Sequence, residues 1–592
     1  MSKVTLTLDG QQVSVDPGTT VLEAARSLGK RIPTLCYLEG VQAIGACRVC
    51  LVEVEGAKTL VASCVMPVAE GMKVHTNTRR VREARRTVVE LLLSDHDGDC
   101  QTCNRSADCE FQALASELGI LEVSYPGEKS AKVVDATTPA LVRDSSKCVL
   151  CRRCVTVCGL TQGVGAIFPQ RRGFDTIVGP AFCANLDSVV CVQCGQCAAV
   201  CPVGALTEKD QIAEVWAALD DPSKHVVVQT APAIRAALGE CFGYPPGTLV
   251  TGKMVSALRR LGFDAVFDTN FTADLTIIEE GTELLTRLKK ALVAKEPVAL
   301  PMFTSCSPGW IKYAEHFFPE ILPNLSTCKS PQQMFGAVAK TYYAEKIGKR
   351  PEDIFVVSIM PCTAKKFEAQ RAEMNASGVR DVDVVLTTRE LGRMIKQAGI
   401  DFGSLPDDKM DAPLGLSSGA ADIFANTGGV MEAALRTAYE IVTGRPLPFE
   451  NLHVQPIAGL DGVKEASLKI EGTVPEWSFL EGATLNVAVA HGLGNARKVI
   501  ERVQSGQAQY HFIEVMTCPG GCIGGGGQPR LTTDAVRKAR ISAIYKEDEG
   551  KKLRKSHENP EIKQIYEEFL VKPLGEKSHH LLHTHYEVRE KV

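Results

Sequence analysis

The sequence predicts a multidomain protein of mixed α/β class, with small cysteine-rich modules followed by a larger α/β domain. The chain has 592 residues, enough for roughly four domains at about 150 residues each. Cysteine occurs 22 times, and most of these residues stand in short, regularly spaced runs. From about residue 210 onward, apolar strand-like segments alternate with helical ones, which is the pattern of an α/β fold.

The N-terminal segment predicts a β-hairpin, then a helix, then cysteine-bearing loops. Residues 4–8 and 11–15 alternate apolar and polar side chains around an Asp-Gly turn. Thr20 and Glu23 form a capping box, which predicts that a helix begins directly after Thr20. Four cysteines follow with the spacing C-x10-C-x2-C-x13-C in glycine-containing loops, where backbone amides can approach sulfur: Cys36, Cys47, Cys50 and Cys64.

The next segment predicts a helix over residues 81–94 and then a loop with one histidine and three cysteines. A histidine beside acidic residues is usually a solvated loop residue. Here three cysteines lack a fourth partner for a metal cluster, and the spacing H-x3-C-x2-C-x5-C places an imidazole where it would supply one. The candidate ligands are His96, Cys100, Cys103 and Cys109.

Two further cysteine runs share one spacing, C-x2-C-x2-C-x3-C, and predict two [4Fe–4S] clusters. The first three thiolates of a run can hold one cubane cluster, while the chain carries the fourth to the other cluster. The protein is therefore expected to move single electrons. The runs are Cys148, Cys151, Cys154 and Cys158, then Cys191, Cys194, Cys197 and Cys201.

A disulfide scaffold and a pair of zinc ribbons are the alternatives, and both fit poorly. Disulfide-dense proteins are short and extracellular, whereas this chain is long and starts without the positive and apolar regions of a secretion signal. We therefore expect reduced thiols in the cytoplasm. Structural zinc usually takes two CxxC pairs separated by a loop, not three steps in succession.

Charge and hydropathy argue against other classes. The net charge of −4 argues against a nucleic-acid partner. The longest apolar runs, such as residues 88–93, are far shorter than the ~20 residues of a membrane span, so no membrane partner is expected. Residues 492–494 lack the third glycine of a dinucleotide loop and no GxxxxGK occurs, so the chain should not bind NAD itself.

The C-terminal two thirds predict parallel strands that end in unusual motifs. Open α/β sheets place their sites at the carboxyl ends of strands. The motifs there are rich in Cys, Pro and Gly and occupy residues 303–310, 360–368 and 514–523, the last followed by four glycines. The expected strands cover residues 226–228, 297–303, 354–359, 382–386 and 485–489.

In this order and behind the cysteine array, the three motifs resemble the signatures of [FeFe]-hydrogenase over nearly the whole chain. The first two cysteine sets also resemble the front end of complex I's large electron-input subunit. The resemblance implies one [2Fe–2S] cluster, three [4Fe–4S] clusters and an H-cluster. The parts it implies are a β-grasp [2Fe–2S] ferredoxin-like domain (1–78), a His-ligated [4Fe–4S] module with one histidine and three cysteines (79–125), a bacterial-type 2[4Fe–4S] ferredoxin-like domain (126–210), a two-lobed α/β H-cluster domain (211–535) and a small-subunit-like C-terminal wrap (536–592).

An H-cluster is a [4Fe–4S] cubane that one cysteine bridges to a diiron subsite carrying CO, cyanide and azadithiolate. The resemblance makes Cys522 the bridging ligand and makes Cys362 and Cys518 cubane ligands. A lysine would donate to a cyanide, since a charge-assisted hydrogen bond fixes an anionic acceptor, and two methionines would be apolar contacts of the diiron subsite. These residues correspond to Lys365, Met360 and Met516.

The first motif departs from the family pattern, which has two adjacent cysteines, because here the second is Ser307. A serine alkoxide is a harder and far more basic ligand than a thiolate. Ser307 would then ligate the cubane weakly, or Cys306 would take over ligation and give up its role in proton transfer, or the substitution would mark a tuned variant. We favour Ser307 as the ligand because the surrounding motif keeps its register.

The resemblance also implies a proton route that starts at the thiol of Cys306. From the sequence alone, the acidic residues at 279, 280 and 283 would be an ordinary solvated helix face. The family match favours a route instead, and it runs through Glu280, Ser326, Glu283 and Arg287.

The expected function is reversible formation of H2 from two protons and two electrons, which the clusters exchange with ferredoxin or with a flavin- and NAD(P)-binding partner subunit. Maturation proteins would insert the diiron subsite. A hydrogen-sensing or low-activity variant is the alternative that Ser307 raises. An electron-input subunit without hydrogen chemistry would leave Cys362, Cys518 and Cys522 unexplained.

Overall fold

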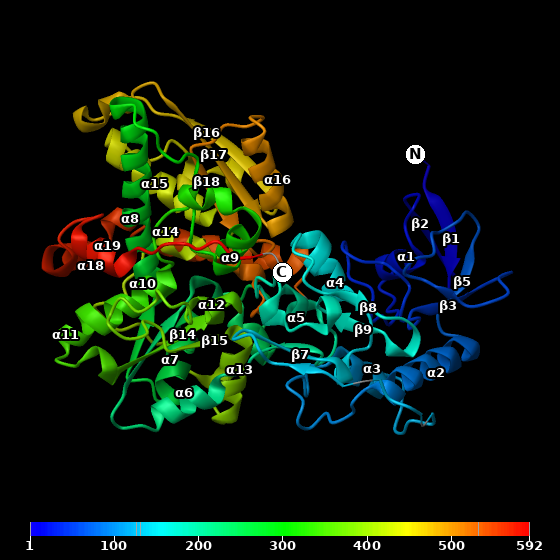
Figure 1. Cartoon of the computed structure of the whole chain (residues 1–592). Coiled ribbons are helices and arrows are strands. Elements are labelled where there is room, and N and C mark those ends of the chain that lie inside the picture. Colours follow the sequence, from blue (N-terminus) through cyan, green and yellow to red (C-terminus); the bar gives the residue numbers. More distant parts are fainter. Residues whose placement is uncertain (1, 126, 131, 531, 591–592) are drawn as a thin grey trace.

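The structure, a computed structural model, describes residues 2–125, 127–130, 132–530 and 532–590 (Figure 1). It confirms the mixed α/β, multidomain class. Three small sheets lie toward the N-terminal end of the chain, and two four-stranded sheets form the larger C-terminal part. No helix among the described residues is long and apolar enough to cross a membrane.

The N-terminal sheet has the strand order β2-β1-β5-β3-β4 and packs against helix α1 (Val21–Ser27). The predicted hairpin is confirmed, since β1 and β2 pair antiparallel with Val4 opposite Val15. The capping box is also confirmed, since Thr20 accepts from the Glu23 amide and the Glu23 carboxylate accepts from the Thr20 amide at 2.8 Å. The strands are β1 (Val4–Leu8), β2 (Gln11–Val15), β3 (Leu51–Val54), β4 (Val61–Ala62) and β5 (Lys73–His75).

A long helix, α2 (Arg79–Asp95), leads from this sheet into the remaining cysteine-bearing segments and ends one residue before His96. The helices that follow are short because cysteine loops interrupt them. They are α3 (Glu110–Glu117), α4 (Arg153–Thr156) and α5 (Gln196–Val200). The strands are β6 (Val134–Asp135), β7 (Leu141–Asp144), β8 (Phe168–Gln170), β9 (Ile177–Gly179) and β10 (Leu206–Glu208).

One parallel sheet of the C-terminal part has the order β12-β11-β14-β15. Its strands are mostly apolar and buried because helices cover the sheet, as in other α/β folds. The strands are β11 (His225–Thr230), β12 (Ala265–Asp268), β14 (Ile354–Met360) and β15 (Val384–Thr387), and the helices include α6 (Ile212–Leu219), α7 (Thr251–Leu261), α10 (Pro331–Val338) and α13 (Thr388–Gln397).

The other sheet has the order β13-β18-β17-β16 and is parallel except for β16. The prediction of a strand over 297–303 is mostly wrong, because only Met302 and Phe303 pair with β18. Pro297 and Pro301 lack the N–H that a ladder needs. The strands are β13 (Met302–Phe303), β16 (Val463–Lys469), β17 (Thr484–His491) and β18 (Phe512–Met516), with helices α9 (Pro308–Phe317), α15 (Gly429–Thr443) and α16 (Leu493–Gln504).

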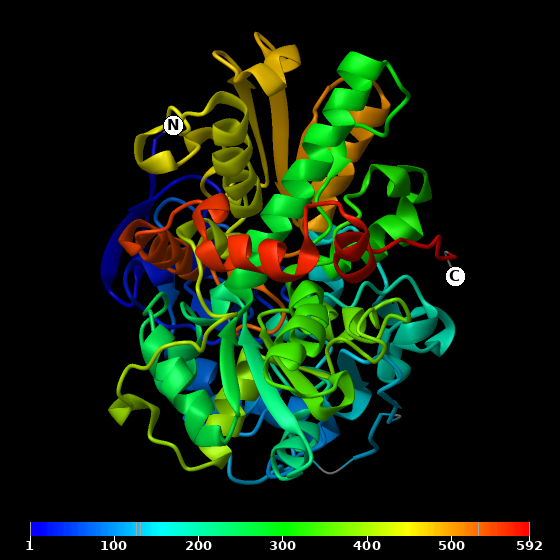
Figure 2. The ribbon, with the colours of Figure 1, turned by 90° about the vertical axis from the view of Figure 1, so that its left-hand side faces the viewer.

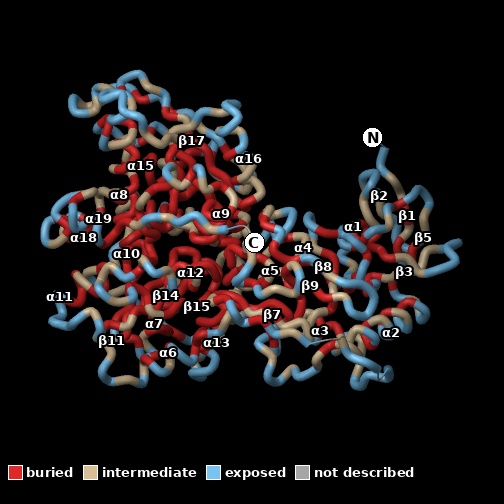
Figure 3. Tube along the Cα trace, viewed as in Figure 1, coloured by how far each residue is buried: buried red, intermediate tan, exposed pale blue. Residues whose placement is uncertain are grey.

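The long helix α8 (Thr269–Lys289) joins these two halves, and burial is concentrated around it and the two sheets (Figure 3). After α17 (Asp534–Gly550), the chain ends in two short helices, α18 (Pro560–Ile565) and α19 (Glu576–Leu582). Figure 2 shows this C-terminal segment, in red, lying across the green helices α8 and α10. The segment therefore covers the helix that carries the predicted glutamates.

Candidate functional site

The three motifs meet because the strands before them end at the same place. Strands β13, β14 and β18 each lead directly into a motif, and the motif side chains line one cavity of about 80 Å³. The cavity lies between the two four-stranded sheets. All eight residues predicted there line it: Cys306, Ser307, Met360, Cys362, Lys365, Met516, Cys518 and Cys522.

The thiols in this cavity fit a metal cluster better than they fit a set of free thiolates. Burial raises the pKa of Cys362 and of Cys518, and it raises the pKa of Cys522 to about 12. Charge repulsion from Cys362 adds to the shift at both of the other thiols. Bound iron would supply the positive charge that holds them deprotonated. The donor set is therefore consistent with a cubane and its bridging cysteine.

Lys365 reaches the cavity from helix α12 (Ala364–Glu368), which begins just after β14. Its ammonium donates to the backbone oxygen of Cys306 at 3.1 Å and to the carboxylate of Glu368 at 2.9 Å. Sequence reasoning missed the role of Glu368, although its position three residues after Lys365 on a helix is the spacing of an ion pair. The pair holds a positive charge at the cavity wall.

The Ser307 hydroxyl contacts Thr517, the residue before Cys518. The two hydroxyl oxygens lie 2.7 Å apart, and the Thr517 amide donates to Ser307 Oγ at 3.2 Å. Two polar partners at one oxygen are the arrangement that stabilises negative charge on it. Nothing in the sequence pointed to Thr517 beyond its place in the third motif.

Glycines allow the second cysteine run to approach the three motifs closely. Gly195 has a left-handed φ of 71°, and a side chain there would collide with Thr363. A side chain at Gly526 would collide with the backbone oxygen of Cys194. The loop that bears Cys194 therefore lies directly against the second and third motifs.

In the structure, the fourth cysteine of each run lies with the first three cysteines of the other run. One cavity is lined by three cysteines of the first run and one of the second: Cys148, Cys151, Cys154 and Cys201. The other cavity is lined by the reverse combination: Cys158, Cys191, Cys194 and Cys197. Two separate sets of four thiols result.

The thiols of the N-terminal sheet also converge. Cys36 lies within hydrogen-bonding reach of Cys47 and Cys64, and Cys50 lies within reach of Cys64. In the next module, His96 is buried, and its Nδ1 has no hydrogen-bond partner among the described residues. Burial lowers the pKa of His96, which favours the neutral imidazole that binds metal. Cys100, Cys103 and Cys109 are half-buried.

The predicted proton-route residues lie along α8 and the loop beside it. The solvated-face interpretation is wrong, because Glu279, Glu280 and Glu283 are all buried. Ser326 donates to Glu283 at 3.1 Å, and Arg287 pairs with Glu283 at 2.7 Å. Apolar residues around α8 pack against both four-stranded sheets, so the helix has no free face for these acids.

Glu280 differs from its neighbours because neither carboxyl oxygen has a well-oriented hydrogen bond among the described residues. Ser326 and the backbone of Ser305 lie nearest to it. Burial, with some repulsion from Glu283, raises the pKa of Glu280 to about 8. A carboxyl of this kind is neutral at pH 7 and can gain or lose a proton near that pH.

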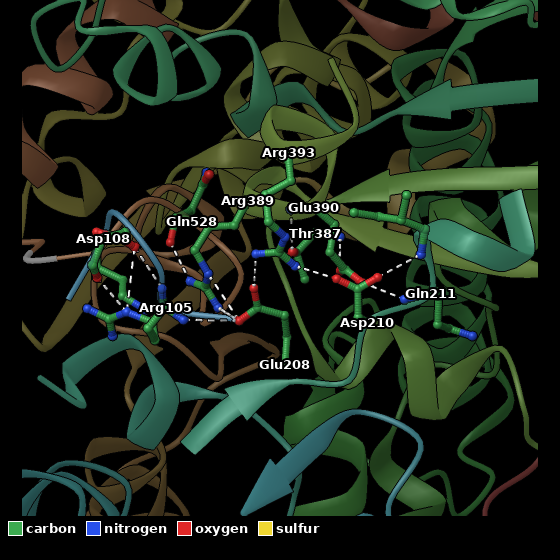
Figure 4. A network of polar contacts seen from close by, with 12 residues as sticks. Arg105, Asp108, Glu208, Asp210, Gln211, Thr387, Arg389, Glu390, Arg393 and Gln528 are labelled. Carbon is green, nitrogen blue, oxygen red and sulfur yellow. Dashed lines mark hydrogen bonds and ion pairs between the residues drawn. The ribbon is translucent and has the colours of Figure 1, made fainter. Parts of the chain in front are cut away.

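A buried ion-pair network, which sequence reasoning missed, holds the cysteine-bearing module on the larger C-terminal part (Figure 4). Glu208, at the end of β10, pairs with Arg389 at 2.6 Å, with Arg393 at 2.9 Å and with Arg530 at 3.3 Å. Although burial alone would raise it, these arginines hold the pKa of Glu208 well below its usual range. Arg530 also pairs with Asp108, so the His96 module joins the same network.

Comparison with known families agrees with this architecture. The profile of the iron only hydrogenase large subunit, C-terminal domain, matches residues 224–526, about half of the chain. The chain therefore belongs to the iron-only hydrogenase family. Other profiles that match are the iron hydrogenase small subunit (534–589), a 2Fe-2S iron-sulfur cluster binding domain (1–79), the NADH-ubiquinone oxidoreductase-G iron-sulfur binding region (85–124) and a 4Fe-4S binding domain (185–207).

Similar curated proteins span the whole chain. NADP-reducing hydrogenase subunit HndD of Solidesulfovibrio fructosivorans is 53% identical, with 100% of both chains covered. Iron hydrogenase 1 of Clostridium pasteurianum is 42% identical and covers 98% of this chain and 99% of its own. Among solved structures, apo [FeFe]-hydrogenase HydA1 from Chlamydomonas reinhardtii superposes with a TM-score of 0.58 at 47% identity, covering 64% of this chain and 99% of its own.

Proposed function

We propose that this chain is the catalytic subunit of an [FeFe]-hydrogenase that interconverts H2 with two protons and two electrons. One observation carries the proposal: the three motifs converge on a single buried cavity, and the loop of Cys194 lies against it. Membership of the iron-only hydrogenase family agrees with this function. Sensing is not favoured, because the similar proteins that span the whole chain are named as hydrogenases.

In this proposal Cys362, Cys518, Cys522 and Ser307 would hold the H-cluster, which would supply the binding and heterolytic cleavage of H2. Lys365 would hold an anionic ligand of the diiron subsite by a charge-assisted hydrogen bond. Its ammonium is held by Glu368 and by the backbone oxygen of Cys306, which lines the cavity. Met360 and Met516 exclude water from the wall that they line.

We assign the electron route to one [2Fe–2S] cluster and three [4Fe–4S] clusters in the N-terminal parts. The two thiol sets with exchanged fourth members support two cubanes in the segment 126–210. The buried Nδ1 of His96 supports a third in 79–125. The β-grasp domain 1–78 holds the [2Fe–2S] cluster, 211–535 is the two-lobed catalytic domain, and 536–592 is the small-subunit-like wrap.

We assign the proton route to Cys306, Glu280, Ser326, Glu283 and Arg287. Cys306 lines the cavity, and Glu280 is close enough for its charge to raise the pKa of that thiol after burial. Glu280 can take a proton near pH 8 and pass it through the Ser326 hydroxyl to Glu283. These side chains hold and move the proton, while the cofactor holds the electrons.

The electron partner that we propose is a flavin-containing, NAD(P)-binding subunit, with ferredoxin as the second candidate. The similarity over the full length to a protein named as a subunit of an NADP-reducing hydrogenase supports the first. Separate maturation proteins would insert the diiron subsite.

The test is to measure H2 evolution and uptake by anaerobically purified, matured protein while recording the infrared bands of CO and cyanide. Ser307→Cys is the matched variant. Infrared bands together with H2 turnover support the proposal. A higher turnover rate in Ser307→Cys than in the wild type would show how much the serine lowers the rate. Bands without turnover would contradict a catalytic role. Bands that appear only in Ser307→Cys would show that Ser307 prevents assembly.

A further inference from the structure

The C-terminal segment pairs with the stretch of chain that carries Ser326. The Lys329 amide donates to the Leu582 oxygen at 2.7 Å, and the Thr584 amide donates to the Thr327 oxygen at 2.8 Å. Cys328 and His583 are thereby opposed in an antiparallel bridge. This backbone pairing fixes His583 beside the proposed proton route.

His583 is connected to Glu283 through one hydroxyl group. Thr327 Oγ1 donates to Glu283 Oε2 at 3.2 Å and lies 2.8 Å from His583 Nδ1. The Thr327 amide also donates to the same carboxylate at 3.1 Å, which holds the threonine in place. A hydroxyl between a carboxyl and an imidazole can accept a proton on one side and release its own on the other.

The other nitrogen of His583 faces a charged partner. Its Nε2 lies 3.2 Å from Glu279 Oε2, and Tyr566 donates to the second oxygen of Glu279 at 2.5 Å. Although burial alone would raise it, hydrogen bonds from His583 and Tyr566 hold the pKa of Glu279 below its usual range. Glu279 therefore remains a carboxylate that can stabilise a positively charged His583.

His583 also lies beside an exposed imidazole. Its ring packs against His579, one turn earlier on α19, with ring centroids 4.4 Å apart, and His579 is exposed. The other assigned exit, Arg287, donates to the backbone oxygens of Ala299 and Leu325, and a guanidinium does not release its proton in proteins. Imidazole, in contrast, gains and loses protons near neutral pH.

We propose that the C-terminal segment supplies a second branch of the proton route, from Glu283 through Thr327 and His583 to His579 and water. The inference rests on the proposed hydrogenase function. During H2 oxidation, protonated Glu283 gives its proton to Thr327 Oγ1 while the threonine hydrogen moves to His583 Nδ1. A bridging water then carries a proton from His583 to His579, because no hydrogen bond joins the two imidazoles among the described residues. H2 formation uses the same steps in reverse, and no electrons move along this branch.

The groups that face His583 are Glu279, Glu283, Cys328, His579 and, through Glu279, Tyr566. Burial raises the pKa of Cys328 well above its usual range, so this thiol stays neutral and does not compete for the proton. Two carboxylates and one imidazole therefore set the charge around the branch.

The decisive variants are Thr327→Val, which removes the hydroxyl but keeps the shape, and Thr327→Ser, which keeps the hydroxyl. We expect Thr327→Val to slow H2 oxidation about five-fold, because protons must then leave by the slower end of the route at Arg287, and Thr327→Ser to stay within about two-fold of the wild type. His583→Ala should slow turnover similarly and recover when imidazole is added. His580→Ala is the control, because His580 is an exposed histidine on α19 that lies outside the proposed branch.

A second measurement tests whether the branch carries protons and does not depend on H2 turnover. The buried Glu280 carboxyl, neutral at pH 7, should have a C=O infrared band that shifts when D2O replaces its proton. Thr327→Val and His583→Ala should slow that exchange in protein that lacks the diiron subsite. The branch would be overturned if both variants kept the wild-type rates of exchange and turnover. It would also be overturned if Thr327→Ser lost as much rate as Thr327→Val, or if imidazole did not restore the rate of His583→Ala. Wild-type protein that shows the infrared bands but no turnover would instead overturn the proposed function, and the exchange rates would still decide the branch.

Discussion

Glu280→Gln should stabilise the fold at alkaline pH while it stops proton transfer. The Glu280 carboxyl is 1% exposed, has no well-oriented hydrogen bond among the described residues, and has a pKa raised by burial to about 8 from an ordinary 4.5. A raised carboxyl pKa means that the folded state holds a proton that the unfolded chain releases. The contribution of this carboxyl group to the free energy of unfolding is complete below about pH 4.5 and is lost progressively as the pH rises from there to about 8.

The size of the effect follows from the two pKa values. At 1.36 kcal/mol for each tenfold change in proton affinity, the loss between pH 4.5 and pH 8 is at most ~5 kcal/mol. Glutamine has nearly the same shape and cannot ionise, so Glu280→Gln escapes this loss. For a domain of this size, we expect a melting temperature about 5 to 10 °C above the wild type at pH 8.5 and nearly equal to it at pH 5.

The assay is thermal unfolding of cubane-loaded protein at both pH values, beside H2 turnover of matured protein. Turnover of Glu280→Gln should fall at least about 100-fold. Glu279→Gln is the matched control, because the neighbouring carboxylate is hydrogen-bonded and has a lowered pKa, so its loss should destabilise the protein at neutral pH. Equal melting temperatures of Glu280→Gln and wild type at pH 8.5 would refute the reasoning, and so would retained turnover.

Three further substitutions test the parts around this helix. Cys201→Ser should impair the cluster that Cys201 holds with Cys148, Cys151 and Cys154, and it should spare the cluster held by the other cysteines of its own run. Metal analysis and EPR distinguish the two clusters, and loss of the second cluster instead of the first would contradict the exchange of fourth ligands. His96→Cys should lower the reduction potential of its cluster, since thiolate adds negative charge. Redox titration measures this potential, and an unchanged value would contradict the assignment of His96. Glu208→Gln should cost about 3 to 5 kcal/mol, because three arginines lose a buried carboxylate, and it should expose the junction near residue 210 to proteolysis; an unchanged melting temperature would count against the network.

Local patterns in the sequence predicted much of the fold. The hairpin of residues 4–15, the helix after Thr20 and the long helix before His96 follow from alternation and capping, which act within a few residues. The strand expected over 297–303 failed because that interpretation gave apolar composition more weight than two prolines.

Contacts between distant residues could not be predicted in the same way. The sequence placed Ser307 in the first motif but could not show that Thr517, 210 residues away, supplies its hydrogen bonds. From the sequence alone the acidic residues of α8 would form a solvated face, and only the family resemblance argued against it, because the burial of Glu279, Glu280 and Glu283 depends on tertiary packing. Glu208 and its arginines come from separate segments, and nothing local connects them.

The closely packed glycines at positions 195 and 526 have an electronic consequence. Electron tunnelling falls off exponentially with the length of the gap, so a small displacement of the loop that bears Cys194 would change the rate of the last transfer steeply. Side chains at these positions would have to push that loop away from Thr363 and the third motif. In the proposed electron route, two residues without side chains would therefore keep the tunnelling distance into the catalytic cavity short.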